Sequence, residues 1–561
     1  MRTEGPRSAG DRDLGWADNL ESVPALHWIS SVRPEVRDRL DADAVLRGAL
    51  LAVVAASPWL SRVCASDPLA LEVLADLEAP LPQMPAGVPY DRLRRLKELG
   101  VLHIAARDLL GLDDVEAVGR SLSGLAETVL SEALAGAAAP TDDLAVIGLG
   151  KLGAAELNYA SDIDLMLVVP DAGGPEGLLD PRPFIELARS AWRIDLDLRP
   201  EGRSGALVRT LPSYQAYWSR WAEAWEFQAL LKARPVAGDE PLGAAFAASA
   251  SQQVWGRPFG AEELRQLRRM KARSENELGR RNLMEREIKR GRGGIRDIEF
   301  AVQLLQLVHG RTDPSVRVPA TLDALRALSG GGYVAPDDAD GLDAAYRFLR
   351  TVEHRLQLYE GQQVHTLPQS AERRSHLALV MGFRHDGIRS AEQQFEETLR
   401  DHRVRARSIH ERLFFRPLLE VFTSAHPATA LSEEAVAERL AAFGFSDAAR
   451  TAQAVSELTR GFSRISQLMH RTLPLLLDWL STSPDPDQGL LGLRVLASGA
   501  QSRDRLVALC RESPAGARRL CQLLGTAPRF ARDLQRHPDR LAGLASGDFP
   551  AARSREELGE Q

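Results

Sequence analysis

The chain has 561 residues, enough for several buried cores, and its 44% hydrophobic and 26% charged residues are typical of ordinary globular proteins. A net charge of -7 and a pI near 6.0 argue against a nucleic-acid partner, because general affinity for nucleic-acid backbones needs a strongly basic surface. Three cysteines without zinc-site spacing, a polar start without a signal peptide and no run of 18 apolar residues predict a cytoplasmic protein that does not enter a membrane.

The first part of the chain is expected to be helical. From about Asp41 to Ala138, apolar residues such as Leu93 and Leu96 recur at spacings of three and four among Arg and Glu. Segments end at Pro and Gly clusters, for example between Pro80 and Gly87. We therefore predict an N-terminal helical region over residues 1–140.

The pattern changes to α/β after this region. Leu144 to Ile147 is a short apolar run that ends in glycines, and Ile163 to Val169 is rich in β-branched and apolar residues. Two further strands are expected at 191–198 and 206–210. These strands predict an α/β domain over 141–240.

The remainder is again helical in pattern. We predict a helical domain over 241–415 that packs on the α/β domain, and a second helical region over 416–561. The Pro-rich stretch from Ser483 to Asp487 is expected to be a loop between helices. The expected helices span 261–278, 295–309, 338–360, 390–414, 433–443, 450–481 and 515–535. The predicted fold is mostly α, with an inserted α/β domain.

A weak internal repeat links the two ends of the chain. Ser57-Pro58-Trp59, followed by Asp67-Pro68 and Leu71, recurs as Ala527-Pro528-Arg529, followed by His537-Pro538 and Leu541, always 470 residues later. Helices that begin with proline resemble one another, so coincidence is one explanation. The other is that a second homologous unit begins here, with its own acidic strand beyond residue 561.

A glycine-rich turn follows the first predicted strand. It reads Gly148-Leu149-Gly150-Lys151-Leu152-Gly153 and leads into a short helix. Glycines allow backbone N–H groups to approach a polyphosphate, and a helix N-terminus favours anions. A dinucleotide-binding fold is the alternative, but its acidic residue is expected about 20 residues further on, whereas acids occur here after eight.

Those acids are Asp162 and Asp164. Residues two apart on a strand project from the same face, so their carboxylates point together while Ile163 enters the core. Asp195, in Ile194-Asp195-Leu196-Asp197, supplies a third acid from another strand. Carboxylates combined with substrate phosphates are the ligands that Mg²⁺ prefers, so we predict a magnesium site for transfer at phosphorus. Solvated acids at a strand edge are the alternative.

These motifs resemble the glutamine synthetase adenylyltransferase/adenylyl-removing family, within the DNA polymerase β-like nucleotidyltransferase superfamily. The similar blocks are Gly150 to Asp164, Asp195 to Gly202, Trp225 to Arg234 and Lys289 to Phe300. Carried over by position, the resemblance implies that Asp162, Asp164 and Asp195 are the catalytic metal ligands. It implies nucleotide or phosphate binding by Gly150, Lys151, Gly153, Ser161, Arg199 and Lys232. Asp197 stands where relatives often have a basic residue, and we expect it to face solvent.

The resemblance also implies a reaction. Such enzymes attach AMP from ATP to a tyrosine of glutamine synthetase and remove it by phosphorolysis that yields ADP, with removal in the N-terminal half. Because this site precedes the repeat, we expect removal, with phosphate and ATP or ADP as ligands and with the PII signalling protein and glutamine as effectors. The resemblance implies that this reaction regulates nitrogen assimilation. The alternatives are adenylylation at this site, a uridylyltransferase-like enzyme and a non-catalytic nucleotide-binding regulator.

Overall fold

The structure is a computed structural model that describes residues 35–546 apart from 82–87, 138–142, 172–179, 258–262, 264–265, 268–269, 272–276, 279, 281–282, 424–444, 460–472, 474–475, 478, 482 and 528. The chain divides into two compact units. The first contains Met1–Pro258 and Ala272–Arg407, and the second contains Phe259–Lys271 and Ser408–Gln561. Among the described helices, none combines the length and apolar character that a membrane crossing requires.

The first unit begins with the predicted helices. They are α3 (Glu35–Ala42), α4 (Ala44–Ala56), α5 (Pro58–Ser66), α6 (Ala70–Ala75), α7 (Pro89–Leu109) and α8 (Val115–Gly136). Polar caps fix where several of them start. Asp43 accepts hydrogen bonds from the backbone N–H groups of Val45 and Leu46 at 3.0 Å, and Asp114 caps α8 in the same way. The long helices α7 and α8 pack on each other around buried leucines.

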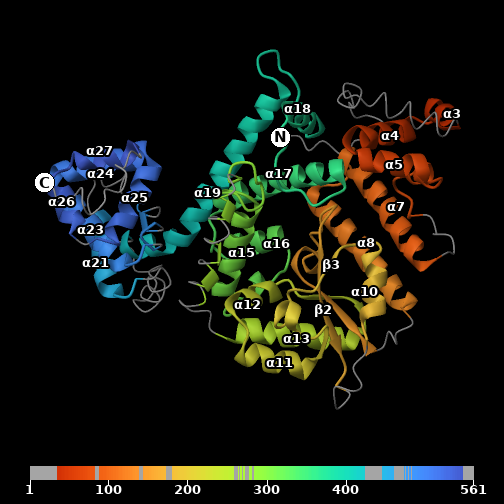
Figure 1. Ribbon diagram of the computed structural model, residues 1–561, viewed down its shortest axis with the longest axis horizontal. Coiled ribbons are helices and arrows are strands. Elements are labelled where there is room, and N and C mark those ends of the chain that lie inside the picture. Colours follow the sequence, from red (N-terminus) through yellow and green to blue (C-terminus); the bar gives the residue numbers. More distant parts are fainter. Residues whose placement is uncertain are drawn as a thin grey trace, which may run out of the picture. The chain divides into compact units, whose positions relative to one another are not determined.

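A five-stranded mixed sheet follows, in the order β3-β2-β1-β5, with β4 also on β2 (Figure 1). Its strands are β1 (Ala145–Gly148), β2 (Ile163–Val169), β3 (Ile194–Asp195), β4 (Val208–Thr210) and β5 (Arg234–Gly238). β2 is antiparallel to β1 and parallel to both β3 and β4. The predicted strands at 191–198 and 206–210 are shorter than expected: the chain turns at Asp197, which ends β3, and β4 begins only at Val208, after η3 (Gly202–Ser204).

The sheet is covered on both faces. Ile163 and Leu165 belong to the large core that the N-terminal helices form, together with α10 (Arg182–Arg189). The residues of opposite parity, such as Met166, face the other side, where α13 (Glu240–Gly256) contacts β1, β2 and β5. α11 (Leu211–Arg220) and α12 (Ala224–Leu230) pack on α13. Asp162 and Asp164 share the parity of Met166, so they lie on the face away from the large core.

Helices after the sheet complete the first unit. They are α15 (Ile295–His309), η4 (Pro314–Val316), α16 (Thr321–Gly330), α17 (Pro336–Glu360), α18 (Ala371–Val380) and α19 (Ala391–Thr423), of which α19 belongs to the first unit only as far as Arg407. The prediction for 295–309 is confirmed to the residue, since Gly294 precedes the helix and Gly310 ends it. The prediction for 338–360 is two residues short at its start, where Pro336 occupies the first turn.

The described part of the second unit is helical. It contains α21 (Ala448–Thr459), α23 (Pro486–Ser498), α24 (Ala500–Glu512), α25 (Pro514–Leu524), α26 (Phe530–Arg536) and α27 (Arg540–Ser546). One helix was predicted over 515–535, and this is wrong: Gly525 ends α25, and its backbone accepts a 3.0 Å hydrogen bond from Asp485. The predicted helix at 433–443 and most of that at 261–278 lie outside the described residues, as does part of 450–481.

The helices at the two ends of the chain follow the same order at the offset of the sequence repeat. Residues 470 positions after α4, α5 and α6 lie in α25, α26 and α27, and α25 packs on α26 and α27 as α4 packs on α5 and α6. The N-cap positions also match, because Asp43 caps α4 and Ser513 caps α25. Leu71 and Leu541 are both buried.

Candidate active site

The sheet places three predicted acids side by side. Asp164 lies on β2 opposite Asp195 on β3, in a parallel ladder, and Asp162 immediately precedes β2. The backbone N–H of Ile163 donates to the carbonyl of Arg193 at 3.0 Å, which fixes the two strands at the acidic end. A ladder position holds a backbone far more firmly than a loop would, so the register determines how close these carboxylates lie.

The glycine turn lies directly against Asp164. The backbone N–H of Leu149 donates to the Asp164 carbonyl at 2.9 Å, and Gly150 has a φ of +52°. A Cβ at Gly150 would overlap the Asp164 carboxylate. Glycine is therefore required here for its left-handed backbone and for this close approach. The one-turn helix α9 (Gly150–Gly153) follows, as the short-helix prediction required.

The environment of Asp164 disfavours its charge. Burial, together with the neighbouring carboxylates of Asp195 and Asp162, raises the pKa of Asp164 to about 6, although the nearby ammonium groups of Lys289 and Lys151 lower it. Clustered carboxylates of this kind repel one another unless a cation joins them. Oxygen donors in this arrangement fit a hard divalent cation.

The other two carboxylates have partners in the protein. Asp162 is ion-paired with Arg193, whose Nη2 also donates to the Gln363 side-chain oxygen at 2.5 Å. Asp195 accepts a 2.7 Å hydrogen bond from the backbone N–H of Asp197. Across the described part of the chain, no three His, Cys, Asp or Glu side chains converge closely enough to form a ready metal cage. Asp162, Asp164 and Asp195 are neighbours and remain a predicted ligand set.

Lys151 points from the glycine turn to another element. Its ammonium forms a 3.1 Å ion pair with Glu299 on α15, and only 11% of its side chain is exposed. Burial lowers the pKa of Lys151, and the Glu299 carboxylate acts in the opposite direction. Burial raises the pKa of Glu299, but Lys151, Lys232 and Lys289 outweigh this and lower it to about 2. The ion pair ties the glycine turn to α15.

Lys232 and Gly153 occupy packing positions. Lys232 is 8% exposed, and its ammonium forms a 2.9 Å ion pair with Glu156 and donates to the Thr321 hydroxyl at 3.3 Å. A Cβ at Gly153 would overlap the Lys232 carbonyl, so this glycine allows the turn to approach the segment before β5. The contacts observed for both residues are with other groups of the protein, and phosphate binding by them stays a prediction.

Arg199 braces the loop after β3. Its buried guanidinium donates to the carbonyls of Leu196, Gly205 and Arg203 at 2.6, 3.1 and 3.1 Å. Ser161 lies half-buried in the turn before Asp162, and its N–H donates to the Asn158 carbonyl. Asp197 was expected to face solvent, and its side chain is 41% exposed and paired with Arg203. Asp197 contacts the three acids through its backbone, whose N–H donates to Asp195, while its side chain pairs with Arg203.

Three charged residues that surround these acids were not among the predicted site residues. Arg193 pairs with Asp162, Glu299 pairs with Lys151, and Lys289 lies in the loop before α15, close enough to lower the pKa of Asp164. One signal was available for Arg193, because it alternates with Asp195 along the strand and so shares its face. No local pattern indicates that 289–299 folds against residues 150–164.

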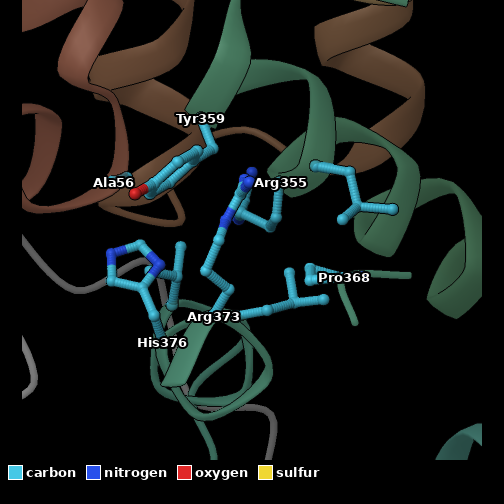
Figure 2. Close-up of a pocket in the computed structure, with 9 residues that line it drawn as sticks. Ala56, Arg355, Tyr359, Pro368, Arg373 and His376 are labelled. Atoms are coloured by element: carbon cyan, nitrogen blue, oxygen red, sulfur yellow. The ribbon is translucent and has the colours of Figure 1, made fainter. Parts of the chain in front are cut away.

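A separate small cavity lies between α17, α18 and the end of α4. It encloses about 10 Å³, about the space that one water needs. Figure 2 shows Tyr359 and His376 on one side of it and Pro368 on the other, with Arg355 and Arg373 also in its wall. The Arg355 guanidinium donates two hydrogen bonds, of 2.6 and 2.8 Å, to the Asp108 carboxylate. None of the predicted site residues lines this cavity, so it is not the candidate active site.

Known proteins match the sequence of this chain over most of its length. The family profile for glutamate-ammonia ligase adenylyltransferase matches residues 48–183 and 187–249, which include the glycine turn and the three acids. A profile described as GlnD PII-uridylyltransferase matches residues 263–414, a helical part of the chain.

Curated relatives share one description, bifunctional glutamine synthetase adenylyltransferase/adenylyl-removing enzyme. The relative from Streptomyces avermitilis is 39% identical over 92% of this chain and 54% of its own length. That from Streptomyces coelicolor is 38% identical over 98% of the chain and 58% of its own length. That from Mycobacterium tuberculosis is 40% identical over 82% of the chain and 48% of its own length. The chain spans about half the length of these relatives, and by this similarity it belongs to the glutamine synthetase adenylyltransferase/adenylyl-removing family.

Proposed function

We propose that this chain removes AMP from an adenylyl-tyrosine of glutamine synthetase by phosphorolysis. The observation that carries the proposal is the pairing of Asp164 with Asp195 across β2 and β3, with Asp162 beside them and the glycine turn against Asp164. A phosphate oxygen attacks the adenylyl phosphorus, the bond from phosphorus to the tyrosine oxygen breaks, and tyrosinate leaves and takes up a proton. The products are ADP and unmodified tyrosine.

In this proposal the three carboxylates hold Mg²⁺. The bound cations would supply charge neutralisation at the phosphorus and at the leaving oxygen. The parallel ladder orients Asp164 and Asp195, and the lack of a side chain at Gly150 lets the turn pack directly against the Asp164 carboxylate. Partial burial of Asp164 excludes water from the reacting centre and strengthens each charge interaction there. Lys151, Ser161, Arg199, Gly153 and Lys232 then act mainly by shaping the turn and loop, and Lys151 and Lys289 supply positive charge.

The direction of the reaction is proposed from position. In the family that the sequence resembles, removal belongs to the first of two homologous halves. This site lies before the helices that repeat α4, α5 and α6, so it belongs to the first copy. Glutamine synthetase is the partner in the names of the relatives, and PII protein and glutamine are proposed effectors.

The test is to incubate the chain with adenylylated glutamine synthetase, Mg²⁺ and phosphate. We expect phosphate-dependent release of ADP, lost in Asp162→Ala/Asp164→Ala. Transfer of AMP from ATP to unmodified glutamine synthetase, without ADP release, would assign this site to adenylylation. Turnover that survives in the double variant would mean that the acids are not the catalytic centre.

A second candidate is a uridylyltransferase-like enzyme that acts on a PII protein. It is favoured by the profile match at 263–414, which covers the helices from α15 to most of α19 but leaves out the acidic strands. Comparing ATP with UTP, and glutamine synthetase with a PII protein as acceptor, separates the two. Uridylyl transfer to PII would replace the main proposal.

A further inference from the structure

Arg193 lies at the edge of the carboxylate group. Its backbone is fixed, because its carbonyl accepts the N–H of Ile163 at 3.0 Å. Its side chain is 66% exposed and reaches the Asp162 carboxylate, whereas the Asp162 side chain is 22% exposed. The same Nη2 donates to Gln363, in the segment between α17 and α18, at 2.5 Å. The Arg193 backbone is thus fixed, while its largely solvated guanidinium pairs with Asp162, a predicted metal ligand.

The Arg193 guanidinium occupies one oxygen of the Asp162 carboxylate, and the divalent cation would bind the same carboxylate. Two cations on one carboxylate repel each other, so the guanidinium and a metal ion compete for Asp162. An exposed pair contributes little free energy, and a divalent cation has twice the charge of a guanidinium. Replacement of the guanidinium by the divalent cation therefore costs little free energy. The displaced side chain stays on the same face of the site, because Arg193 and Asp195 share one face of the strand.

We propose that Arg193 is a counter-ion that a divalent cation displaces from Asp162, and that the released guanidinium then binds the phosphate of the substrate. The second half rests on the function proposed above. A planar guanidinium with several N–H donors matches two phosphate oxygens, which a lysine in the same place would not. Gln363 gives the guanidinium a second anchor beside the carboxylates. Binding of the metal and readiness for phosphate are thus coupled through one side chain.

The first test measures metal binding without substrate. Mn²⁺ binding is followed by electron paramagnetic resonance of the free ion in the wild type, Arg193→Gln and Arg203→Gln. Arg203 is a matched control, since it forms an exposed 2.8 Å pair with Asp197 on the same loop. We expect Arg193→Gln to bind Mn²⁺ about two- to fivefold more tightly than the wild type, and Arg203→Gln to be unchanged. Unchanged or weaker binding by Arg193→Gln, in protein with a wild-type melting curve, overturns the exchange.

The second test measures inorganic phosphate on the Mn²⁺-loaded protein by the paramagnetic relaxation of its ³¹P signal. This readout needs no turnover, so it stands even if the proposed function fails. We expect Arg193→Gln to weaken phosphate binding about tenfold or more, with Arg193→Lys between the two and Arg203→Gln unchanged. Wild-type phosphate affinity in Arg193→Gln overturns the phosphate role. Absence of ADP release by the wild type, with both binding results as expected, would count against the proposed function and leave the exchange supported.

Discussion

Asp164 is the residue on which the chemistry of the site depends most. It contacts the glycine turn, faces Asp195 across the ladder and is largely removed from water. Its pKa, raised to about 6 from an ordinary value near 3.8, means that a proton binds the folded chain more tightly than the unfolded chain. That contribution to stability is complete below pH about 4 and is lost as the pH rises through about 6.

Replacing this acid is therefore expected to stabilise the metal-free protein at neutral pH. Asp164→Asn should raise the free energy of unfolding at pH 7.5 by on the order of 1–2 kcal/mol. The gain should shrink as the pH falls and vanish below about pH 4, where the wild-type carboxyl is protonated in both the folded and the unfolded chain. Chemical denaturation with a metal chelator present measures this. Asp197→Asn, at an exposed position, should stay within about 0.5 kcal/mol of the wild type. A destabilised Asp164→Asn at pH 7.5 would contradict the environment assigned to Asp164.

Gly150 gives a steric prediction at the same scale. An alanine there meets the Asp164 carboxylate and must adopt a φ of +52°, so Gly150→Ala should lose Mn²⁺ binding by roughly tenfold or more while the helical regions remain folded. Gly124→Ala is the control, because nothing lies within 4 Å of a Cβ at this position on α8. That variant should bind Mn²⁺ normally and gain roughly 0.5–1 kcal/mol in stability. Normal metal binding by Gly150→Ala would show that the turn is not part of the site.

At the scale of elements, buried ion pairs connect the α/β domain with the helices that follow. Glu156, just after the glycine turn, receives the Lys232 ammonium and also accepts from Thr321 on α16, through its N–H at 2.7 Å and its hydroxyl at 3.0 Å. Arg350 on α17 donates to the Glu156 carbonyl at 2.8 Å. One carboxylate therefore joins the turn, the segment before β5 and α16.

Removing that carboxylate should destabilise the first unit strongly. Glu156→Ala leaves Lys232 charged and buried, so we expect a loss of roughly 3–5 kcal/mol in the free energy of unfolding. Glu397→Ala removes an exposed partner of Arg389 and should cost less than about 1 kcal/mol. Urea titration of both variants measures the difference. Equal, small losses would mean that the buried pair does not hold the elements together.

The sequence predicted the elements that carry strong local patterns. β1 and β2 follow from apolar β-prone runs, and α15 from its flanking glycines. β5, from Arg234 to Gly238, was not predicted, because Pro235 and Gly238 obscure its pattern and it exists through pairing with β1. The sequence also could not predict the long-range partners of Lys151, Lys232 and Asp162. Glu299 is 148 residues from Lys151, and no local spacing connects them.

For the whole molecule, the main feature is the recurrence of α4, α5 and α6 as α25, α26 and α27 at an offset of 470 residues. The N-caps and the buried leucines match as well as the sequence. A chance likeness between helices that begin with proline would not produce these additional matches. We predict that the gene encodes, about 470 residues after Asp162, a second glycine turn followed by an Asp-x-Asp strand. Reading the downstream sequence checks this. A downstream sequence without that pair of motifs would make the repeat a local likeness of helices.

We propose above that the site formed by Asp162, Asp164 and Asp195 removes AMP from glutamine synthetase. The most direct measurement uses glutamine synthetase that carries radiolabelled AMP on its tyrosine, mixed with the chain, Mg²⁺ and phosphate. We predict that the label appears as ADP, only when phosphate is present and only when Asp162, Asp164 and Asp195 are intact. Label that stays on glutamine synthetase under these conditions, while the chain transfers AMP from ATP to the unmodified enzyme, would contradict it.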